Sequence, residues 1–285
     1  MGDALMNFIR HFLLAVQFFT RIPITGKLAD WVGYSPAMLR ASAAHFPAVG
    51  MLVGAVAAGV YALLAAVLPD TTFAPLVAAV LSTIATALLT GGFHEDGLAD
   101  VADGLGGSYD KTRALEIMKD SRVGAFGAMA LVLALLAKVA LLSLLGGVEG
   151  VDAIPEGWHE RPFTGWYVCS ALFAGHVVSR TASLLLIAWL PHVGDADASK
   201  SKPLADQISP GSLFIAFLWC FMALALVLCA QAATDLIAAC SFSLVALLAM
   251  HRLFKRRLQG FTGDCLGAAQ QVCEIAFYLG LAISL

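Results

Sequence analysis

The chain has 285 residues, of which 60% are hydrophobic and 13% are charged, and its formal net charge is −3. Its mean hydropathy is +0.83. Soluble globular proteins carry about 25% charged residues, so this composition excludes a soluble domain and indicates an all-α polytopic membrane protein. We expect one integral-membrane domain over residues 1–285 and no nucleic-acid partner.

The N-terminal segment is apolar but short. Residues 5–20 are interrupted by polar side chains, and they fall short of the about 20 residues that cross a bilayer. We predict an interfacial or re-entrant helix that ends before Pro23, because proline disfavours helical geometry in the residue before it. A polar connection is expected to continue to Arg40.

About seven transmembrane helices are expected after this segment. The apolar run 212–250 is too long for one span, so Gln231 to Asp235 is the expected turn of a helical hairpin. The run 73–90 is predicted to continue without a break into a charged segment. The expected spans are about 45–68, 73–90, 123–145, 166–190, the two halves of 212–250, and 265–285.

Lysine and arginine gather in alternate loops of this arrangement. Loops 1–44, 91–122, 191–211 and 251–264 hold the basic loop residues, whereas the opposite loops hold Arg161 alone. The positive-inside rule therefore predicts a cytoplasmic N-terminus and an outside C-terminus. All the chemically rich loops then face the cytoplasm, where a soluble, phosphate-bearing substrate would meet them.

Five acidic or imidazole side chains follow the second expected span, within residues 91–104. In a helix that turns about 100° per residue, Asp96, Asp100 and Asp103 fall at roughly 0°, 40° and −20°, on one narrow face. Three carboxylates on one face repel unless a cation lies among them, and Mg²⁺ takes carboxylate and phosphate oxygens. We predict a magnesium site; the alternative is a solvated acidic cap on an apolar helix.

The other two side chains of this group lie off that face. Glu95 and His94 are about 100° and 200° away, so direct metal ligation by them is less expected, although Glu95 stays a candidate ligand. His94 is a candidate proton acceptor, with a hydrogen-bonded structural histidine as the alternative.

A basic segment follows within 111–122. Its members Lys111, Arg113, Lys119 and Arg122 would, together with a metal, suit a diphosphate. The alternative is an ordinary positive-inside loop. Arg122 is favoured because it lies where a helix meets the membrane and arginine binds phosphate bidentately.

Charged residues also occur inside or at the ends of expected spans. Arg180 and Glu274 lie deep in apolar sequence, where a charge is costly and indicates a functional site. Lys138 lies nearer the outer end of its span and is expected to snorkel to the surface. Asp264 precedes the last span, as a site residue or as its N-cap.

Four motifs together resemble the cobalamin synthase family, the adenosylcobinamide-GDP ribazoletransferases. They are AVQFFTRIP at 15–23, GGFHEDGLADVADGLGG at 91–107, EIMKDSRVG at 116–124, and TGDCLGA at 262–268 with Glu274 after it. The resemblance spans most of the chain and is thinnest between about 146 and 260.

The resemblance implies the late joining step of the cobalamin nucleotide loop at the bacterial inner membrane. A ribose hydroxyl of α-ribazole, or of its 5′-phosphate, attacks the phosphorus on the cobinamide side of adenosylcobinamide-GDP. GMP leaves and adenosylcobalamin or its 5′-phosphate forms, with Mg²⁺ as cofactor.

The same resemblance suggests roles for the charged residues. Asp96, Asp100 and Asp103 would position the metal and diphosphate, with one of them or His94 as base. The expected phosphate and substrate contacts are Lys119, Arg122, Arg113, Arg180, Asp264 and Glu274.

The acidic segment is also compatible with two other functions. The opening Asp96-Gly97-Leu98-Ala99 is similar to the CDP-alcohol phosphotransferase signature, but Asp100 stands where that signature has arginine. A cation-coupled transporter would use such carboxylates as an ion site, usually near the membrane midplane.

Small residues in the first span, Gly50, Gly54 and Ala58, permit close packing within one chain or between copies in a homo-oligomer.

Overall fold

A computed structural model describes residues 2–149, 165–193, 207–231 and 235–285. Residues 150–164, which include Arg161, and most of loop 191–211 lie outside these described residues. The helices are α1 (Gly2–Phe19), α2 (Gly26–Val32), α3 (Pro36–Ser42), the short 3-10 helix η1 (Ala43–His45), α4 (Phe46–Val67), α5 (Ala74–Thr90), α6 (Phe93–Gly107), α7 (Lys111–Met118), α8 (Ala125–Glu149), α9 (Trp166–Trp189), α11 (Pro210–Ala230), α12 (Leu236–Arg257) and α13 (Gly263–Ile283).

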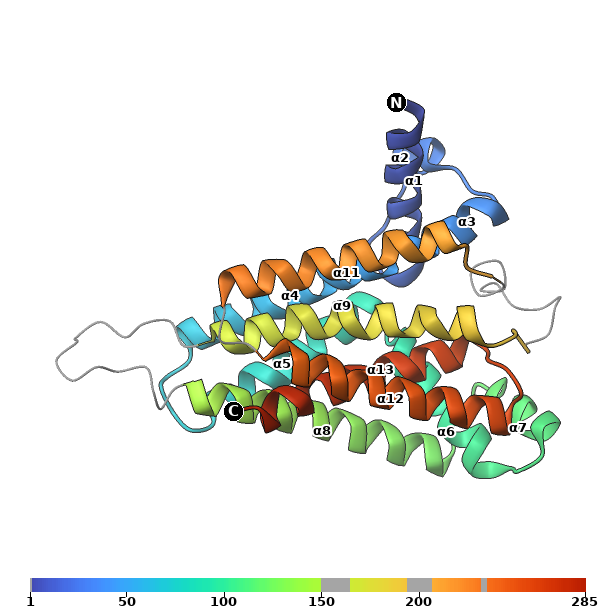
Figure 1. Cartoon of the computed structure of the whole chain (residues 1–285). Coiled ribbons are helices and arrows are strands. Elements are labelled where there is room, and N and C mark those ends of the chain that lie inside the picture. Colours follow the sequence, from blue (N-terminus) through green and yellow to red (C-terminus); the bar gives the residue numbers. More distant parts are fainter. Residues whose placement is uncertain (1, 150–164, 194–206, 232–234) are drawn as a thin grey trace.

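The protein is an all-α polytopic membrane protein, as its composition predicts (Figure 1). In the described part of the chain, 6 helical segments are long and apolar enough to cross a membrane, or up to 7 if a bent pair counts as one span. The 6 segments are Pro36–Val67, Ala125–Val148, Trp166–Trp189, Pro210–Ala230, Leu236–Arg257 and Gly263–Ile283.

The predicted division of the apolar run 212–250 into two helices is confirmed, with part of the expected turn outside the described residues. Helix α11 ends at Ala230, and Asp235 caps the start of α12 by accepting hydrogen bonds from the backbone N–H groups of Ile237 and Ala238. The basic residues that follow were expected in a loop, but Lys255 and Arg257 belong to the last turn of α12. Basic side chains are favourable there because the carbonyl end of a helix is negative.

The predicted continuous helix from the second span into the acidic segment is wrong. Helix α5 ends at Thr90, and α6 starts after a bend of 90°. Gly91 and Gly92 both have left-handed backbones, with φ of 71° and 70°, a conformation that glycine adopts without steric cost. A Cβ atom on Gly91 would also collide with the Arg21 guanidinium. Helix α6 therefore turns out of the direction of α5, and it is not one of the 6 segments that could cross a membrane by themselves.

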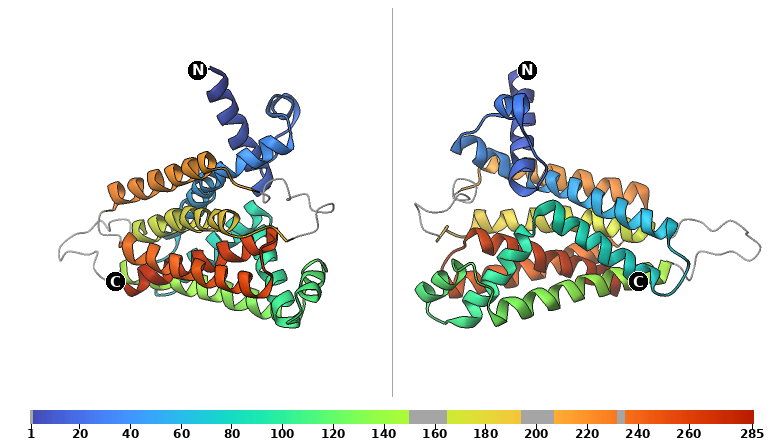
Figure 2. Two further views of the ribbon diagram at one scale, coloured as in Figure 1. Left: turned by 45° about the vertical axis from the view of Figure 1, so that its right-hand side comes forward. Right: turned by 180° about the vertical axis from the view of Figure 1, so that it is seen from behind.

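The polar connections contain more helix than expected. Helices α2 and α3 occupy most of the connection before α4, and α7 lies in the basic segment after α6. Helix α1 leaves the bundle across the direction of the long helices, at the side where α3 lies (Figures 1 and 2). Helices α3, α6 and α7 gather toward one end of the bundle, and the C-terminus lies at the opposite end.

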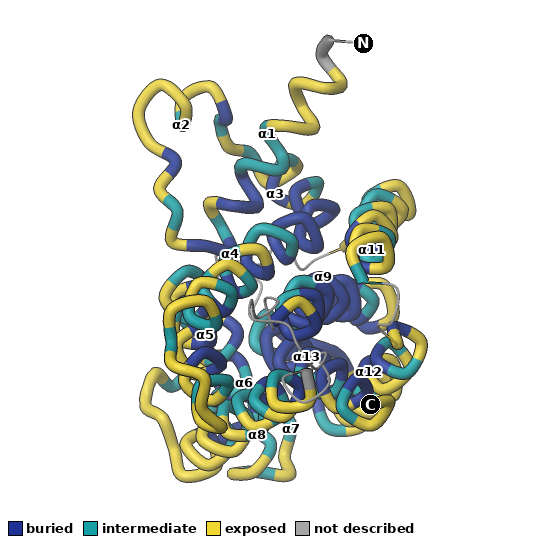
Figure 3. Tube along the Cα trace, turned by 90° about the vertical axis from the view of Figure 1, so that its left-hand side faces the viewer, coloured by how far each residue is buried: buried dark blue, intermediate teal, exposed yellow. Residues whose placement is uncertain are grey.

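Helices α9 and α13 form the centre of the bundle (Figure 3). The share of the apolar stretch that is buried inside the protein is 78% in α9 and 61% in α13. It is 17% in α8 and 22% in each of α11 and α12. Small residues of α4 pack within the chain: a Cβ atom on Gly50 would lie 2.6 Å from His176 O, and one on Gly54 would lie 2.8 Å from Phe173 Cα. Any charged group on the inner faces of α9 or α13 is therefore shielded from both water and lipid.

Candidate active site

The site forms where α6 crosses the start of α13. A Cβ atom on Gly97 would lie 2.8 Å from Asp264 O, and one on Gly267 would lie 3.2 Å from His94 Cα. The first distance is too short for a real Cβ atom against backbone, so the crossing requires glycine at position 97, and the second is tighter than most Cβ contacts, so a side chain at position 267 would press on α6. The close approach brings the acidic face of α6 beside Asp264.

Four carboxylates meet at this crossing. Burial raises the pKa of the Asp100 carboxyl to about 7. The negative charges of Asp264, Asp96 and Asp103 add to this rise, in that order. Because neighbouring carboxylates disfavour one another's ionised forms, this cluster is suited to a cation. The charges of Asp96 and Asp103, which share a face of α6 with Asp100, both act on the Asp100 carboxyl, as the helical register predicts. The charge of Asp264 acts on it from α13.

Asp264 is not the N-cap of α13. Thr262 is the cap, and its hydroxyl accepts a hydrogen bond from Cys265 N at 3.4 Å. The same hydroxyl donates to Asp264 Oδ2 at 3.3 Å. Asp264 therefore lies within the first turn of the helix, with its carboxylate toward the α6 cluster.

Asp103 anchors α8. Its Oδ2 accepts from Gly124 N at 2.7 Å and its Oδ1 accepts from Gly127 N at 2.8 Å. Cβ atoms on either glycine would collide with this carboxylate. Asp103 thus satisfies two backbone donors at the start of a helix, which is the task of a capping residue. The sequence signal for this contact is the pair of glycines three residues apart, Gly124 and Gly127, at the start of α8. The register of Asp103 within α6 does not reveal the contact.

The donor set fits a hard divalent cation. In the described residues, no three histidine, cysteine, aspartate or glutamate side chains are arranged to hold a metal ion by themselves. Mg²⁺ typically uses one or two carboxylates and completes its shell with water and substrate phosphate. Asp96, Asp100 and Asp264 supply carboxylate oxygens of that kind at the α6–α13 crossing.

Glu95 faces a different environment from the aspartates. Its Oε1 accepts a hydrogen bond from Gln271 Nε2 at 3.1 Å. Its charge acts on Arg180, whereas it is not among the charges that act on Asp100. The structure therefore turns Glu95 toward the bundle interior, in line with its position about 100° away from the acidic face.

His94 is buried at the same crossing. Its ring stacks on Phe46 with centroids 5.8 Å apart and an interplanar angle of 9°, and only 2% of the residue is exposed. Burial, reinforced by the positive charge of Arg180, lowers the pKa of His94. A lowered pKa weakens an imidazole as a proton acceptor, so His94 is a weaker candidate base than the sequence suggests.

The basic candidates on and after α7 are exposed and already paired. Arg113 Nη1 lies 2.9 Å from Glu116 Oε2, and Arg122 Nη2 lies 2.5 Å from Asp120 Oδ2. Hydrogen bonds from Arg122 lower the pKa of Asp120 to about 2. A phosphate group would have to replace these carboxylates. Lys119, at the C-cap of α7, is exposed on the same segment.

Arg180 and Glu274 do not reach this surface. Arg180 is 2% exposed and donates to His176 O at 3.0 Å. Glu274 is 1% exposed, with its Oε1 2.6 Å from Lys138 Nζ and its Oε2 3.2 Å from His176 Nδ1. The expectation that Lys138 snorkels is wrong, because its ammonium group is paired with Glu274 in the bundle centre.

Sequence reasoning missed three members of this interior group. Tyr278 donates to Glu274 Oε1 at 3.0 Å, and Gln270 donates to Glu274 Oε2 at 2.5 Å. His176 was also missed. The available signal was spacing: 270, 274 and 278 follow one another at four-residue steps, as do 176 and 180, so each set shares a helix face.

Arg257 was likewise missed as a support of the site. Its Nη2 donates to Leu105 O at 2.9 Å and to Ser108 O at 2.6 Å. These carbonyls lie at the C-terminal end of α6, where a cation is favourable. Arg257 therefore fixes the end of α6 from the last turn of α12.

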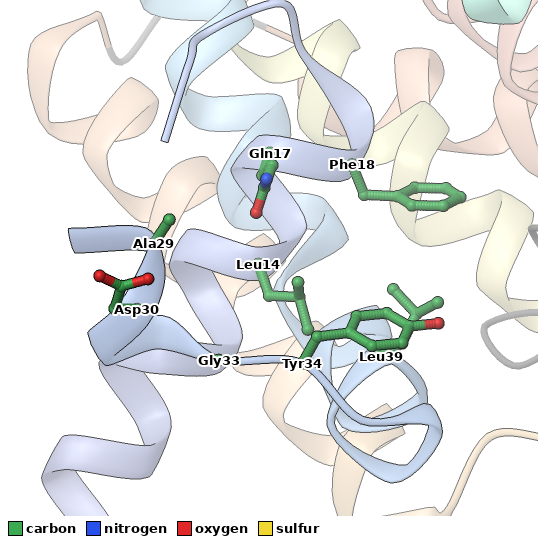
Figure 4. Close-up of a pocket in the computed structure, with 8 residues that line it drawn as sticks. All are labelled: Leu14, Gln17, Phe18, Ala29, Asp30, Gly33, Tyr34 and Leu39. Carbon is green, nitrogen blue, oxygen red and sulfur yellow. The ribbon is translucent and has the colours of Figure 1, made fainter. Parts of the chain in front are cut away.

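A pocket of about 590 Å³ lies beside the N-terminal helices (Figure 4). Phe18, which lines it, also lines a small apolar cavity next to His94. Phe18, near the end of α1, therefore lies between the pocket and the cavity beside His94. Its lining residues are Leu14, Gln17, Phe18, Ala29, Asp30, Gly33, Tyr34 and Leu39.

Comparison with known proteins identifies similar chains over nearly the whole length. Residues 11–282 match the family model described as cobalamin-5-phosphate synthase. A protein of Polaromonas naphthalenivorans named adenosylcobinamide-GDP ribazoletransferase is 71% identical, covering 99% of this chain and 100% of that protein. Proteins with the same name are 61% identical in Albidiferax ferrireducens, over 98% of this chain and 99% of that protein, and 40% identical in Vibrio cholerae, over 94% and 91%. No solved structure matches the chain.

Proposed function

The chain belongs to the cobalamin-5-phosphate synthase family, and we propose that it transfers the adenosylcobinamide phosphate group from adenosylcobinamide-GDP to α-ribazole or α-ribazole 5′-phosphate. GMP is released and adenosylcobalamin or its 5′-phosphate is formed. The observation that carries this proposal at the level of the site is the carboxylate cluster at the α6–α13 crossing, which lies next to an exposed basic segment in the chain.

The reaction exchanges one phosphorus–oxygen bond for another. A ribose hydroxyl oxygen attacks the phosphorus on the cobinamide side, its proton passes to a base, and the bond to the GMP phosphate oxygen breaks. An aspartate of the cluster takes the proton, since the buried His94 is a weak acceptor. Negative charge develops on the departing GMP, and Arg113, Lys119 and Arg122 compensate it.

We propose Mg²⁺ as cofactor, held by one or two of the carboxylates of Asp96, Asp100 and Asp264, with water and substrate phosphate completing its shell. When bound, it would compensate charge on the diphosphate oxygens. Asp103 serves this site indirectly, since its oxygens hold the start of α8 against the end of α6. Glu95 belongs with the interior group, through its contact with Gln271.

The active site is proposed to face the cytoplasm of the bacterial inner membrane, in a single catalytic domain. The support is the basic charge of the segments that gather with α6 and α7 at one end of the bundle, which the positive-inside rule assigns to the cytoplasm (Figure 1). Helix α1 would lie on that membrane surface. It runs across the long helices and exposes apolar side chains such as Leu5 and Ile9.

The test is GMP release by purified protein supplied with adenosylcobinamide-GDP, α-ribazole 5′-phosphate and Mg²⁺. The wild type should release GMP only when both substrates are present. Asp100→Asn should abolish turnover while expression and membrane insertion stay intact. Asp235→Asn is the matched control: it caps α12 at the opposite end of the bundle, and asparagine caps equally well. A folded wild-type sample without GMP release would reject the proposal.

A further inference from the structure

Three charged side chains lie almost fully buried on three helices. Lys138 of α8, Arg180 of α9 and Glu274 of α13 are each 1–2% exposed. Burying a charge is costly unless an opposite charge and hydrogen bonds compensate it. The bundle centre must therefore hold a balanced set of charges.

Glu274 alone does not balance this set. It pairs with Lys138 at 2.6 Å and approaches Arg180 through His176, so among the lysine, arginine and glutamate side chains of this set one positive charge remains. The second carboxylate whose charge acts on Arg180 is Glu95, at the start of α6. Two cations and two carboxylates then balance, and one of the carboxylates belongs to the helix of the active site.

A chain of hydrogen bonds joins the two carboxylates. Gln270 donates to Glu274 Oε2 at 2.5 Å, and Gln271 donates to Gln270 Oε1 at 3.1 Å. Gln271 also donates to Glu95 Oε1 at 3.1 Å. Gln270 and Gln271 are 0% and 4% exposed, and the two bonds that Gln270 shares are buried, whereas the bond to Glu95 is part-buried.

The hydrogen bond to Glu95 can fix the rotation of helix α6 about its own axis. It begins after two successive left-handed glycines, which allow the helix to pivot relative to α5. Glu95 lies about 100° around the helix from Asp96. A fixed Glu95 therefore sets where Asp96 and Asp100 face, while Arg257 secures the other end of α6.

We infer that Lys138 and Glu274 are positioning residues for α6. They act through Gln271 and Glu95 to set the rotation of the helix, a role that rests on the proposed function, in which α6 carries the catalytic carboxylates. Glu274 thus supports the reaction from the bundle centre without touching a substrate phosphate.

The first test removes the charges singly and then as a pair. Lys138→Met leaves an excess negative charge, Glu274→Gln leaves an excess positive charge, and the double variant restores the balance. Each single variant should lose about tenfold or more in kcat, with KM for both substrates unchanged, and the double variant should recover most of that loss. Lys255→Met, at an exposed position of α12, is the control and should keep wild-type rates.

The second test leaves every charge in place. Gln271→Leu removes the donor to Glu95, so the variant stays testable even if the single charge variants fail to fold. Hydrogen exchange of full-length protein should rise about tenfold in α6 relative to α4 in Gln271→Leu, and stay unchanged in Lys255→Met. The kcat of Gln271→Leu should fall as in the single charge variants.

Two results would overturn the positioning role. One is wild-type kcat and wild-type exchange of α6 in Gln271→Leu; the other is a folded double variant as inactive as the single variants. Exchange also separates this role from the proposed function. Increased exchange of α6 in Gln271→Leu, in a protein that releases no GMP even as wild type, would reject the proposed function and support the positioning role.

Discussion

Replacing Gly97 with alanine tests whether the α6–α13 crossing sets the geometry of the site. The new Cβ atom would lie 2.8 Å from Asp264 O and 3.1 Å from Asp264 Cα, and both atoms belong to the backbone. Ordinary contact begins at 3.4 Å, so the helices must separate by about 0.6 Å, at a cost of about 1–3 kcal/mol for overpacking. The separation also moves Asp264 away from Asp96 and Asp100.

The expected result is a large loss of activity with a moderate loss of stability. Misplacement of reacting groups by about 1 Å can cost about 100-fold in rate, so Gly97→Ala should lower kcat/KM by about 10- to 100-fold. The assay is the initial rate of GMP release, with thermal unfolding measured on the same samples. Gly59→Ala is the control, because a Cβ atom there has nothing within 4 Å. Wild-type rates and stability in Gly97→Ala would refute the reasoning.

Three further predictions concern the supports and charges of the site. Asp103→Ala removes both acceptors for the N-terminus of α8 and should destabilise the protein by about 0.5–2 kcal/mol in thermal unfolding, whereas Asp103→Asn, which keeps one acceptor oxygen, should cost less. Asp120→Asn frees the exposed Arg122 for phosphate and should lower KM for adenosylcobinamide-GDP by no more than a few fold, since exposed ion pairs contribute little. EDTA should abolish GMP release and added Mg²⁺ should restore it.

Each of these predictions has an outcome that contradicts it. Unchanged unfolding of Asp103→Ala would show that α8 does not depend on this cap. A raised KM in Asp120→Asn would show that the carboxylate itself assists the substrate. Full activity in EDTA would remove the metal from the mechanism.

Local patterns in the sequence were sufficient for much of the fold. Hydropathy over about 20 residues depends only on neighbouring positions, so it placed the long apolar helices and the division of the run 212–250 into two helices. The register of α6 likewise depends on helical geometry alone, and Asp96 and Asp103 both act on Asp100 as that register predicts.

Features that depend on contacts between distant segments were not predictable in this way. The break between α5 and α6 occurs at two left-handed glycines, and Arg21 of a distant segment packs against Gly91 and donates its backbone N–H to Leu89 O. Lys138 was expected at the surface because it lies near the outer end of its span, and that position does not reveal its partner Glu274 on a distant helix. Asp264 joins the carboxylates only because Gly97 and Gly267 let two helices touch.

Locating a bound Mn²⁺ ion, used in place of Mg²⁺, tests the central claim most directly. Anomalous scattering from crystals of the full-length protein grown with Mn²⁺ would place the ion relative to the side chains. We predict an ion within about 2.0–2.4 Å of carboxylate oxygens of Asp96, Asp100 or Asp264, at the α6–α13 crossing. An ion bound at Glu274 in the bundle centre, or an α6–α13 crossing without any ion at saturating Mn²⁺, would contradict the account.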